Sequence, residues 1–475
     1  MAPPTPAPTP AEIQFNTSSV HPAPQGYTPW AIRNDYPHPK DYPHRARVLP
    51  EVEGDDFSGL PQLPDPGRLP FDPKPWLHVD FKKRPELYCE LIRSYFYEGN
   101  VENGFAVRKN KVRDWYHAPW MHYSDNGREP INGLTFERAT PPNEFAKNQD
   151  RFLQCWACGY FNSEAASVLG GVWQNPNQPN WETNLKFPHG SLVCKNLFNT
   201  ATDGEVPSMH CSPVWEACIA KPPADPNVVP DPKVRLNTAN PVRLVQIDFA
   251  ARDERAPIGW IFGTFVYDGR HANPNLPPVK QWDNMIPVGL QWGNDPKLTQ
   301  EKYDSGVRPQ ELWLNPVALD LLKELGGSRP TWGWNGRMNG PADNFVSACA
   351  SCHSVAQRTL VQRKPTSLIQ TPGPKKIKIV HPDGTVTYKW EQQNEKETMK
   401  WFRNIPAGEP FDDDSISADY SLQVLIGYTN FTEWQAKHVE GVNKPMAHFS
   451  SSTALRAGPL MDYSPDVFDE VVHLK

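Results

Sequence analysis

The chain has 475 residues, 53 of them proline, and a formal net charge of -6. This length exceeds the size at which one hydrophobic core usually stops growing, so two packed regions plus tails are expected. The acidic balance argues against a nucleic-acid partner, because phosphate binding needs a surplus of Lys and Arg. No stretch approaches the roughly twenty apolar residues of a membrane-spanning helix, so we expect a protein that does not span a membrane.

Residues 1–75 are rich in proline, which cannot join helix interiors or central strands. We expect an extended arm that wraps the body or is partly disordered, and we assign it no chemistry. The first residues show neither a positive region nor an apolar segment, so no secretory signal is visible.

Residues 76–339 are predicted to form a β-rich body. Apolar spacing favours a helix over residues 85–97, which Gly99 ends. Alternating apolar residues predict a strand at 245–249, and the apolar run 258–267 that follows a polar loop is predicted to pair with it antiparallel. A turn at 187–190 leads into a further expected strand at 191–195, and residues 285–292 are another candidate. Asn315 and Pro316 are typical of a helix start, and Gly326 ends that helix.

The segment 340–437 is expected to be largely helical, and residues 438–475 to form a tail. Helices are predicted over residues 347–360 and 418–434, with an exposed hairpin near residues 377–388 between them. The fold class is therefore α+β, with a mostly antiparallel sheet body, Pro-rich loops and a helical C-terminal segment.

Cys349-Ala350-Ser351-Cys352-His353 is the attachment pattern of haem c. Two thiols three residues apart on a helical turn can add to the two vinyl groups on one haem edge, while the adjacent imidazole binds the iron. By composition, a chance occurrence of this pattern has a probability of roughly half a per cent. Cys349, Cys352 and His353 are therefore the candidate haem ligands of this segment.

Two other interpretations of the motif stay open. It can be half of a zinc site, for which Cys155 and Cys158 supply a second pair, or it can be a redox dithiol or a plain structural feature. Cys155 and Cys158 have no following histidine, and two buried strand residues are the simpler interpretation of that pair.

The sixth iron position decides what the haem does. A methionine there makes an electron carrier, whereas an open position permits ligand binding or catalysis. Met399, Met446 and Met461 follow the motif, and Met446 is the preferred candidate because it follows Pro445 in a loop-like context. His117 and His122 lie in an aromatic block that is either a packed loop or a wall of the haem site with a distal ligand.

The sequence resembles mono-haem c-type cytochromes found mainly in bacteria. The resemblance rests on the blocks WYHAPW (115–120), GREPI (127–131) and GWIFG (259–263) and on the CxxCH motif. A fainter similarity, through FPHG (187–190), GWIFG and the late CxxCH, links the chain to β-sheet mono-haem cytochromes that include hydroxylamine-oxidising enzymes. In that group a lysine can crosslink to the haem; Lys195 follows the matching block here, and we assign it no such role.

The leading hypothesis is a c-type cytochrome with one covalent haem that transfers single electrons to or from a partner protein or a small oxidant or reductant. The alternatives are a haem enzyme or sensor for a small nitrogen or oxygen species, and a zinc-binding or structural protein without haem. Haem attachment implies the periplasm or the mitochondrial intermembrane space, and the sequence itself leaves the localisation open.

Overall fold

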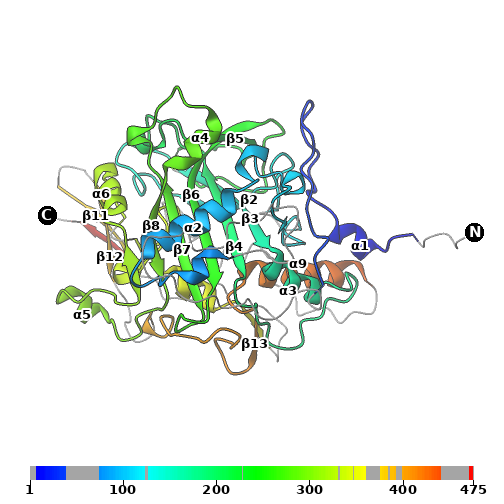
Figure 1. The fold of residues 1–475 in the computed structure, drawn as a ribbon. Coiled ribbons are helices and arrows are strands. Elements are labelled where there is room, and N and C mark those ends of the chain that lie inside the picture. Colours follow the sequence, from blue (N-terminus) through cyan, green and yellow to red (C-terminus); the bar gives the residue numbers. More distant parts are fainter. Residues whose placement is uncertain are drawn as a thin grey trace, which may run out of the picture.

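The computed structural model describes residues 7–38, 74–123, 127–226, 228–329, 332–345, 347–359, 375–382, 386–391, 398–439 and 470–473. Within these residues, nine strands form one antiparallel sheet whose main path runs β1-β3-β4-β6-β7-β8-β9, with β2 paired to β3 and β5 to β6 (Figure 1). The strands are β1 Trp115–Tyr116, β2 Thr135–Thr140, β3 Leu153–Asn162, β4 Leu192–Asn199, β5 Val214–Ala217, β6 Asn240–Arg252, β7 Trp260–Tyr267, β8 Met285–Gln291 and β9 Leu312–Leu314.

The α-helices surround this sheet and are mostly short. They are α1 Pro10–Phe15, α2 Pro85–Tyr97, α3 Ser163–Val172, α4 Pro278–Gln281, α5 Gln300–Asp304, α6 Pro316–Leu325, α7 Cys349–Ser354 and α9 Leu422–His438. Single 3-10 turns occur at Pro75–His78, Val101–Asn103, Val107–Lys109, Pro207–Met209, Gly269–His271, Trp282–Asn284 and Trp334–Gly336. None of the helices in the described residues is long and apolar enough to cross a bilayer.

The two faces of the sheet carry different cores. One core joins the buried face of α2 to strand residues such as Cys194, Ile247 and Phe265, and Figure 1 shows α2 lying across this face. The other face packs against α3, α9 and α7, with Phe161 and Phe262 among its strand residues. Since side chains alternate along a strand, β3, β4, β6 and β7 each contribute residues to both cores.

A polar row crosses the middle of the second face. The register pairs Gly159 of β3 with Lys195 of β4, Lys195 with Asp248 of β6, and Asp248 with Thr264 of β7, and Gly289 of β8 completes the row. We call Lys195, Asp248 and Thr264 the polar row. The flanking glycines allow neighbours to approach the sheet closely: a Cβ at Gly159 would lie 2.1 Å from the amide nitrogen of Gln423 on α9.

The described part of the N-terminal arm, residues 7–38, packs on the body. Phe15 of α1 is buried against Trp173 and Tyr36, with ring centroids 5.9 and 6.3 Å away. The amide of Trp30 donates to the Pro130 carbonyl at 2.8 Å. Residues 7–38 therefore pack on the body, and they contain one short helix, α1, that was not predicted from the sequence.

The mixed α+β class with a mostly antiparallel sheet body is confirmed. Helix α2 has the predicted limits, β6 and β7 pair antiparallel as predicted, and Asn315 and Gly326 cap α6. The expected hairpin is present as β11 Lys375–Val380 and β12 Val386–Glu391, which β14 Glu470–His473 joins in parallel. A two-stranded pair, β10 Gln357–Thr359 and β13 Ser415–Ser417, lies between α7 and α9 in the chain.

The helix predicted over residues 347–360 is shorter in the structure. Helix α7 covers only Cys349–Ser354, and the chain turns into β10 at Gln357. The cause is a competing backbone partner, because the Ala356 carbonyl accepts from the amide of Ala418 at 2.8 Å. The helix predicted over residues 418–434 begins later, at Leu422, after the side chain of Ser421 caps it.

Candidate functional site

The CxxCH motif lies on α7, and the sheet fixes the first turn of that helix. The amide of Ala350 donates to the side-chain oxygen of Gln291 at 3.1 Å, and Gln291 is fully buried on β8. The hydroxyl of Ser351 accepts from the amide of Ala348 at 2.9 Å and donates to its carbonyl at 3.0 Å. These bonds satisfy groups that a helix start leaves unpaired, so α7 is held firmly although it has only six residues.

Cys349 and Cys352 are free thiols, and both are partly exposed. Residues three apart on a helix lie on the same side, so the two sulfur atoms can face one molecule. Burial raises the pKa of Cys349 well above its ordinary value and raises that of Cys352 to about 12. Both thiols are therefore protonated at neutral pH, which disfavours a redox dithiol, because the thiolate is the reactive form.

Cys155 and Cys158 do not lie together on one side of the sheet. Cys155 belongs to a small core that includes Leu153, and Cys158 belongs to the core under α2, because residues three apart on a strand point to opposite faces. Among the described residues there is no group of three or more His, Cys, Asp or Glu side chains placed to hold a metal ion.

His353 has the arrangement expected of an iron ligand. Its Nδ1 atom lies 2.9 Å from the Tyr420 carbonyl oxygen, which can only accept, so Nδ1 carries the proton and Nε2 keeps its lone pair. Burial lowers the pKa of His353 to about 4, although the Tyr420 bond opposes this shift. The imidazole is therefore neutral at neutral pH, and its ring lies 5.1 Å from that of Phe262.

The carbonyl that holds His353 belongs to a segment that is itself tied to the sheet. Asp419 precedes Tyr420, and its carboxylate accepts hydrogen bonds from the Trp260 indole at 2.9 Å and from the amide of Phe187 at 2.6 Å. Trp260 and Phe187 belong to the GWIFG and FPHG blocks. The two blocks thus meet at one buried carboxylate next to the histidine.

The polar row carries a cation between carboxylates. Lys195 Nζ lies 3.4 Å from Asp248 Oδ2 and 3.7 Å from Glu137 Oε2, and the Thr264 hydroxyl donates to Asp248 Oδ1 at 2.7 Å. Burial lowers the pKa of Lys195, but the charges of Glu137 and Asp248 outweigh this effect and raise that pKa above its ordinary value. Lys195 is therefore charged at neutral pH and has no lone pair for a metal.

A glutamine links the polar row to the loop before α7. The amide nitrogen of Gln246 lies 2.7 Å from Asp248 Oδ1 and 2.7 Å from Asp343 Oδ2, and its oxygen accepts from the amide of Ala342 at 2.9 Å. Burial and the charge of Asp343 raise the pKa of Asp248 to about 7. The charge of Asp343 raises the pKa of Cys352 and that of Lys195 lowers it.

The other predicted ligands are placed differently. Met446 lies outside the described residues, and so does Met461, whereas Met399 is described and partly exposed. His117 is buried and its Nδ1 accepts from the amide of Arg33 at 3.0 Å, while His122 Nε2 lies 3.0 Å from the side-chain oxygen of Gln14. Both imidazoles are thus engaged by the N-terminal arm, which favours the packing interpretation of that block.

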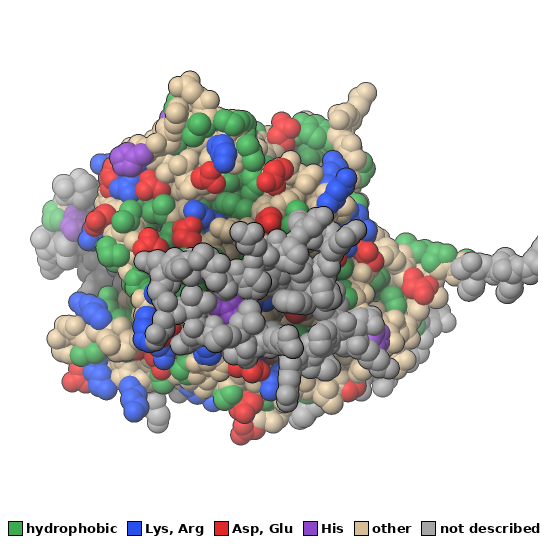
Figure 2. All heavy atoms as spheres, in the orientation of Figure 1, with side chains coloured by type: hydrophobic (Ala, Val, Ile, Leu, Met, Phe, Trp, Pro, Cys, Tyr) green, Lys and Arg blue, Asp and Glu red, His purple; other side chains and the backbone are tan. Residues whose placement is uncertain are grey.

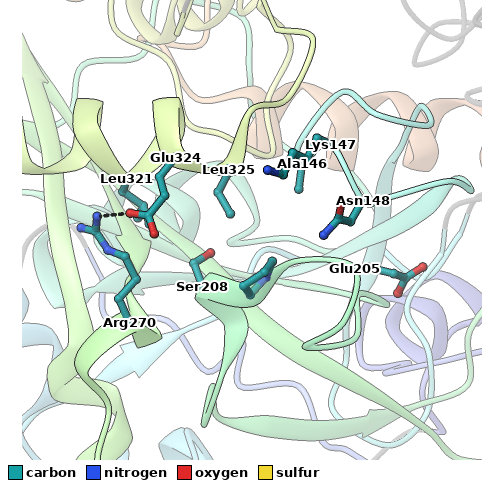
Figure 3. A pocket seen from close by; sticks show the side chains of 10 residues that line it. Ala146, Lys147, Asn148, Glu205, Ser208, Arg270, Leu321, Glu324 and Leu325 are labelled. Atoms are coloured by element: carbon teal, nitrogen blue, oxygen red, sulfur yellow. Dashed lines mark hydrogen bonds and ion pairs between the residues drawn. The ribbon is translucent and has the colours of Figure 1, made fainter.

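A separate cavity of about 300 Å³ lies between α6 and the turn at Pro207–Met209 (Figure 3). Leu321, Glu324 and Leu325 of α6 line one side, and the Arg270 guanidinium points to Glu324 with an ion pair of 2.8 Å. None of the residues predicted from the sequence lines this cavity. Its mixed charges indicate no particular ligand.

No protein-family model, no curated protein and no solved structure matches this chain in the comparisons made. The function of the site therefore has to follow from the chemistry of its own residues. Three of these residues were not expected from the sequence. Tyr420 contributes only its backbone carbonyl, which no side-chain pattern indicates. Asp248 and the buried Gln246 are polar residues that alternate with the apolar residues of β6, and this alternation is the signal that could have found them.

Proposed function

We propose that this chain is a c-type cytochrome that binds one haem through thioether links from Cys349 and Cys352, with His353 as an iron ligand, and that it transfers single electrons. The observation that carries the proposal is the 2.9 Å contact between His353 Nδ1 and the Tyr420 carbonyl oxygen. A histidine that binds a metal through one nitrogen usually donates its other N–H to a carbonyl or carboxylate. Here that donor is satisfied and the second nitrogen is left as a base.

The residues around the motif fit this group. Neither thiol forms a disulfide, both are partly exposed, and the imidazole is neutral and oriented. Phe262 and Tyr420, with ring centroids 5.7 Å apart, add buried aromatic surface next to the imidazole, as a flat apolar macrocycle requires. When bound, haem supplies one-electron iron chemistry, whose potential depends on the axial ligands, hydrogen bonding and burial.

The partner is proposed to be a redox protein or a small oxidant or reductant. Figure 2 shows positive and negative side chains interspersed over the visible face, without a patch of one sign. Attachment of the haem places maturation in the periplasm or the mitochondrial intermembrane space.

The test is a denatured pyridine haemochrome spectrum of the chain expressed with a haem-attachment system. The proposal expects one covalently held haem per chain and a mass increase of one haem. A colourless chain of unmodified mass, made where attachment occurs, would contradict it. Metal analysis of that colourless chain would then separate a zinc protein from a plain structural one.

A second candidate is a haem enzyme or sensor with an open sixth iron position, acting on a small nitrogen or oxygen species. The polar row supports it, because Asp248, with a pKa of about 7, exchanges a proton near neutral pH and Lys195 is charged. Such groups can donate to or accept from a small protic molecule. A ferrous low-spin spectrum that carbon monoxide and nitric oxide leave unchanged would eliminate this candidate and favour the electron carrier.

A further inference from the structure

Asp419 joins three segments that lie far apart in the chain. Its carboxylate is fully buried, and the charge of Arg252 acts on it without an ion pair between the two among the described residues. Besides the bonds from Trp260 Nε1 and the amide of Phe187, Oδ1 accepts from the amide of Gly408 at 2.8 Å. Burial raises the pKa of Asp419, and the Trp260 hydrogen bond opposes this shift.

The backbone at Asp419 and Tyr420 is in the left-handed region at two consecutive positions. Their φ angles are 49° and 67°, which few residues other than glycine adopt and which a bulky aromatic residue rarely does. The conformation is retained by the contacts of both side chains. The carboxylate of Asp419 makes the three bonds above, and the Tyr420 hydroxyl donates to the Ile405 carbonyl at 2.5 Å.

This unusual backbone directs the Tyr420 carbonyl at His353. The same tyrosine packs its ring 5.7 Å from Phe262 and 6.4 Å from Trp260, so the segment is fixed on the strand that the imidazole also contacts. A relaxed backbone at these two positions would turn the carbonyl away from Nδ1. The orientation of the imidazole therefore depends on what holds Asp419.

We propose that Asp419 is the positioning residue of the iron-ligating imidazole: through Trp260, Phe187 and Gly408 it fixes the backbone that presents the Tyr420 carbonyl to His353. This inference rests on the proposed function, because it concerns an iron ligand. The carboxylate of Asp419 bonds to Phe187, Trp260 and Gly408 and not to the thiols or to His353, so Asp419 acts through Tyr420.

A matched control exists elsewhere in the chain. Glu129 is also fully buried, and its carboxylate accepts from the amides of Ile131, Asn132, Leu134 and Cys218 at 2.9, 2.5, 3.2 and 3.3 Å. It closes a turn, and all four of these bonds come from backbone amides of residues 131–134 and of Cys218. Glu129→Gln therefore reports the general cost of neutralising a buried, backbone-bonded carboxylate.

The experiment compares Asp419→Asn, Trp260→Phe and Glu129→Gln with the unchanged haem-loaded chain. Haem content comes from the pyridine haemochrome spectrum, stability from urea unfolding, and the reduction potential from a spectroscopic redox titration. A loosened Nδ1–H bond makes the imidazole a weaker donor to ferric iron. We therefore expect Asp419→Asn to keep covalent haem and to favour the reduced form at least tenfold, which is about 59 mV for one electron.

Trp260→Phe separates positioning from charge. It keeps the carboxylate and removes one of its donors, so a purely Coulombic effect would lower the potential, whereas a less well-held imidazole raises it. We expect a rise smaller than that of Asp419→Asn, and no change for Glu129→Gln. If Asp419→Asn does not fold, the Trp260→Phe result still decides.

The two failures are distinguishable. An unchanged chain without haem defeats the proposed function before any variant is made. A haem-loaded chain whose Trp260→Phe variant has an unchanged or lowered potential overturns the role of Asp419 and leaves the haem assignment standing.

Discussion

Lys195 and Asp248 are direct cross-strand partners on β4 and β6, and their charged atoms lie 3.4 Å apart on the face of the sheet near α7. Glu137 lies within 4 Å of the same ammonium group. Lys195 therefore neutralises carboxylates that burial would otherwise make costly.

Lys195→Ala is expected to lower the free energy of unfolding by about 2 kcal/mol at pH 7. This is less than the roughly 3–5 kcal/mol for breaking a fully buried pair, because 25% of the lysine side chain is exposed. Adding Asp248→Asn should recover part of the loss, with a coupling energy of about 1 kcal/mol in a double-mutant cycle measured by urea unfolding. Strictly additive single effects would contradict the pairing.

The protonation of Asp248 predicts a pH dependence of stability. Its pKa is raised to about 7, so between pH 4 and pH 7 the folded chain holds a proton that the unfolded chain releases. This contribution is complete below pH 4 and is lost as the pH rises through 7, with a slope of up to about 1.4 kcal/mol per unit. Asp248→Asn should flatten the urea-unfolding profile in this window, and an unaltered slope would show that another group titrates.

The two CxxC pairs give opposite predictions for haem attachment. Cys349→Ala with Cys352→Ala should abolish covalent haem, because no thiol remains on α7 to form a thioether. Cys155→Ala with Cys158→Ala serves as the control, since both residues are buried on β3 and point to opposite faces. The pyridine haemochrome spectrum of denatured protein measures both, and loss of haem from the control pair alone would refute the assignment.

The glycine at the end of the polar row faces the end of a flexible side chain from α9. In Gly159→Ala the new methyl would lie 2.1 Å from the amide nitrogen of Gln423, so this side chain must move aside, at a cost of about 1 kcal/mol, the low end for overpacking. Gln423→Ala should restore most of the stability in the double variant. Urea unfolding measures both, and a loss in the single variant that Gln423→Ala does not relieve would show that the new methyl meets something other than Gln423.

The N-terminal arm is expected to contribute to the stability of the body. Phe15→Ala removes a ring that is 7% exposed and packs on Trp173, and should cost about 3 kcal/mol. Ile13→Ala on the same helix is the control, because that side chain is 52% exposed, and its effect should stay within about 0.5 kcal/mol. Equal effects of the two changes in urea unfolding would argue that the arm is not packed as described.

The elements that sequence reasoning placed well have strong local signals. Helix α2 begins at Pro85 with an apolar face, α6 has Asn315 before Pro316 and Gly326 behind it, and apolar residues alternate with polar ones over residues 245–249 of β6. These signals lie within one helical turn or one strand, so the local sequence is enough to predict the element.

The elements that were predicted less well from the sequence depend on partners far away in the chain. The helix at the motif stops at Ser354 because the Ala356 carbonyl accepts a hydrogen bond from the amide of Ala418, 62 residues later. The sequence around Ala356 does not indicate that partner. The site shows the same division. The CxxCH spacing marks its thiols and imidazole, whereas the Tyr420 carbonyl and the pairing of Lys195 with Asp248 follow from sheet register and loop conformation.

His353 on α7 and the Tyr420 carbonyl that orients it are 67 residues apart in the chain. Asp419 and its partner Phe187 are 232 residues apart. Closing loops of this length is slow compared with forming a single turn of helix. Under the proposed function, both thiols would thus be reachable on the open polypeptide before the imidazole is locked, so a covalent adduct could be made first and then enclosed as the last long-range contacts form.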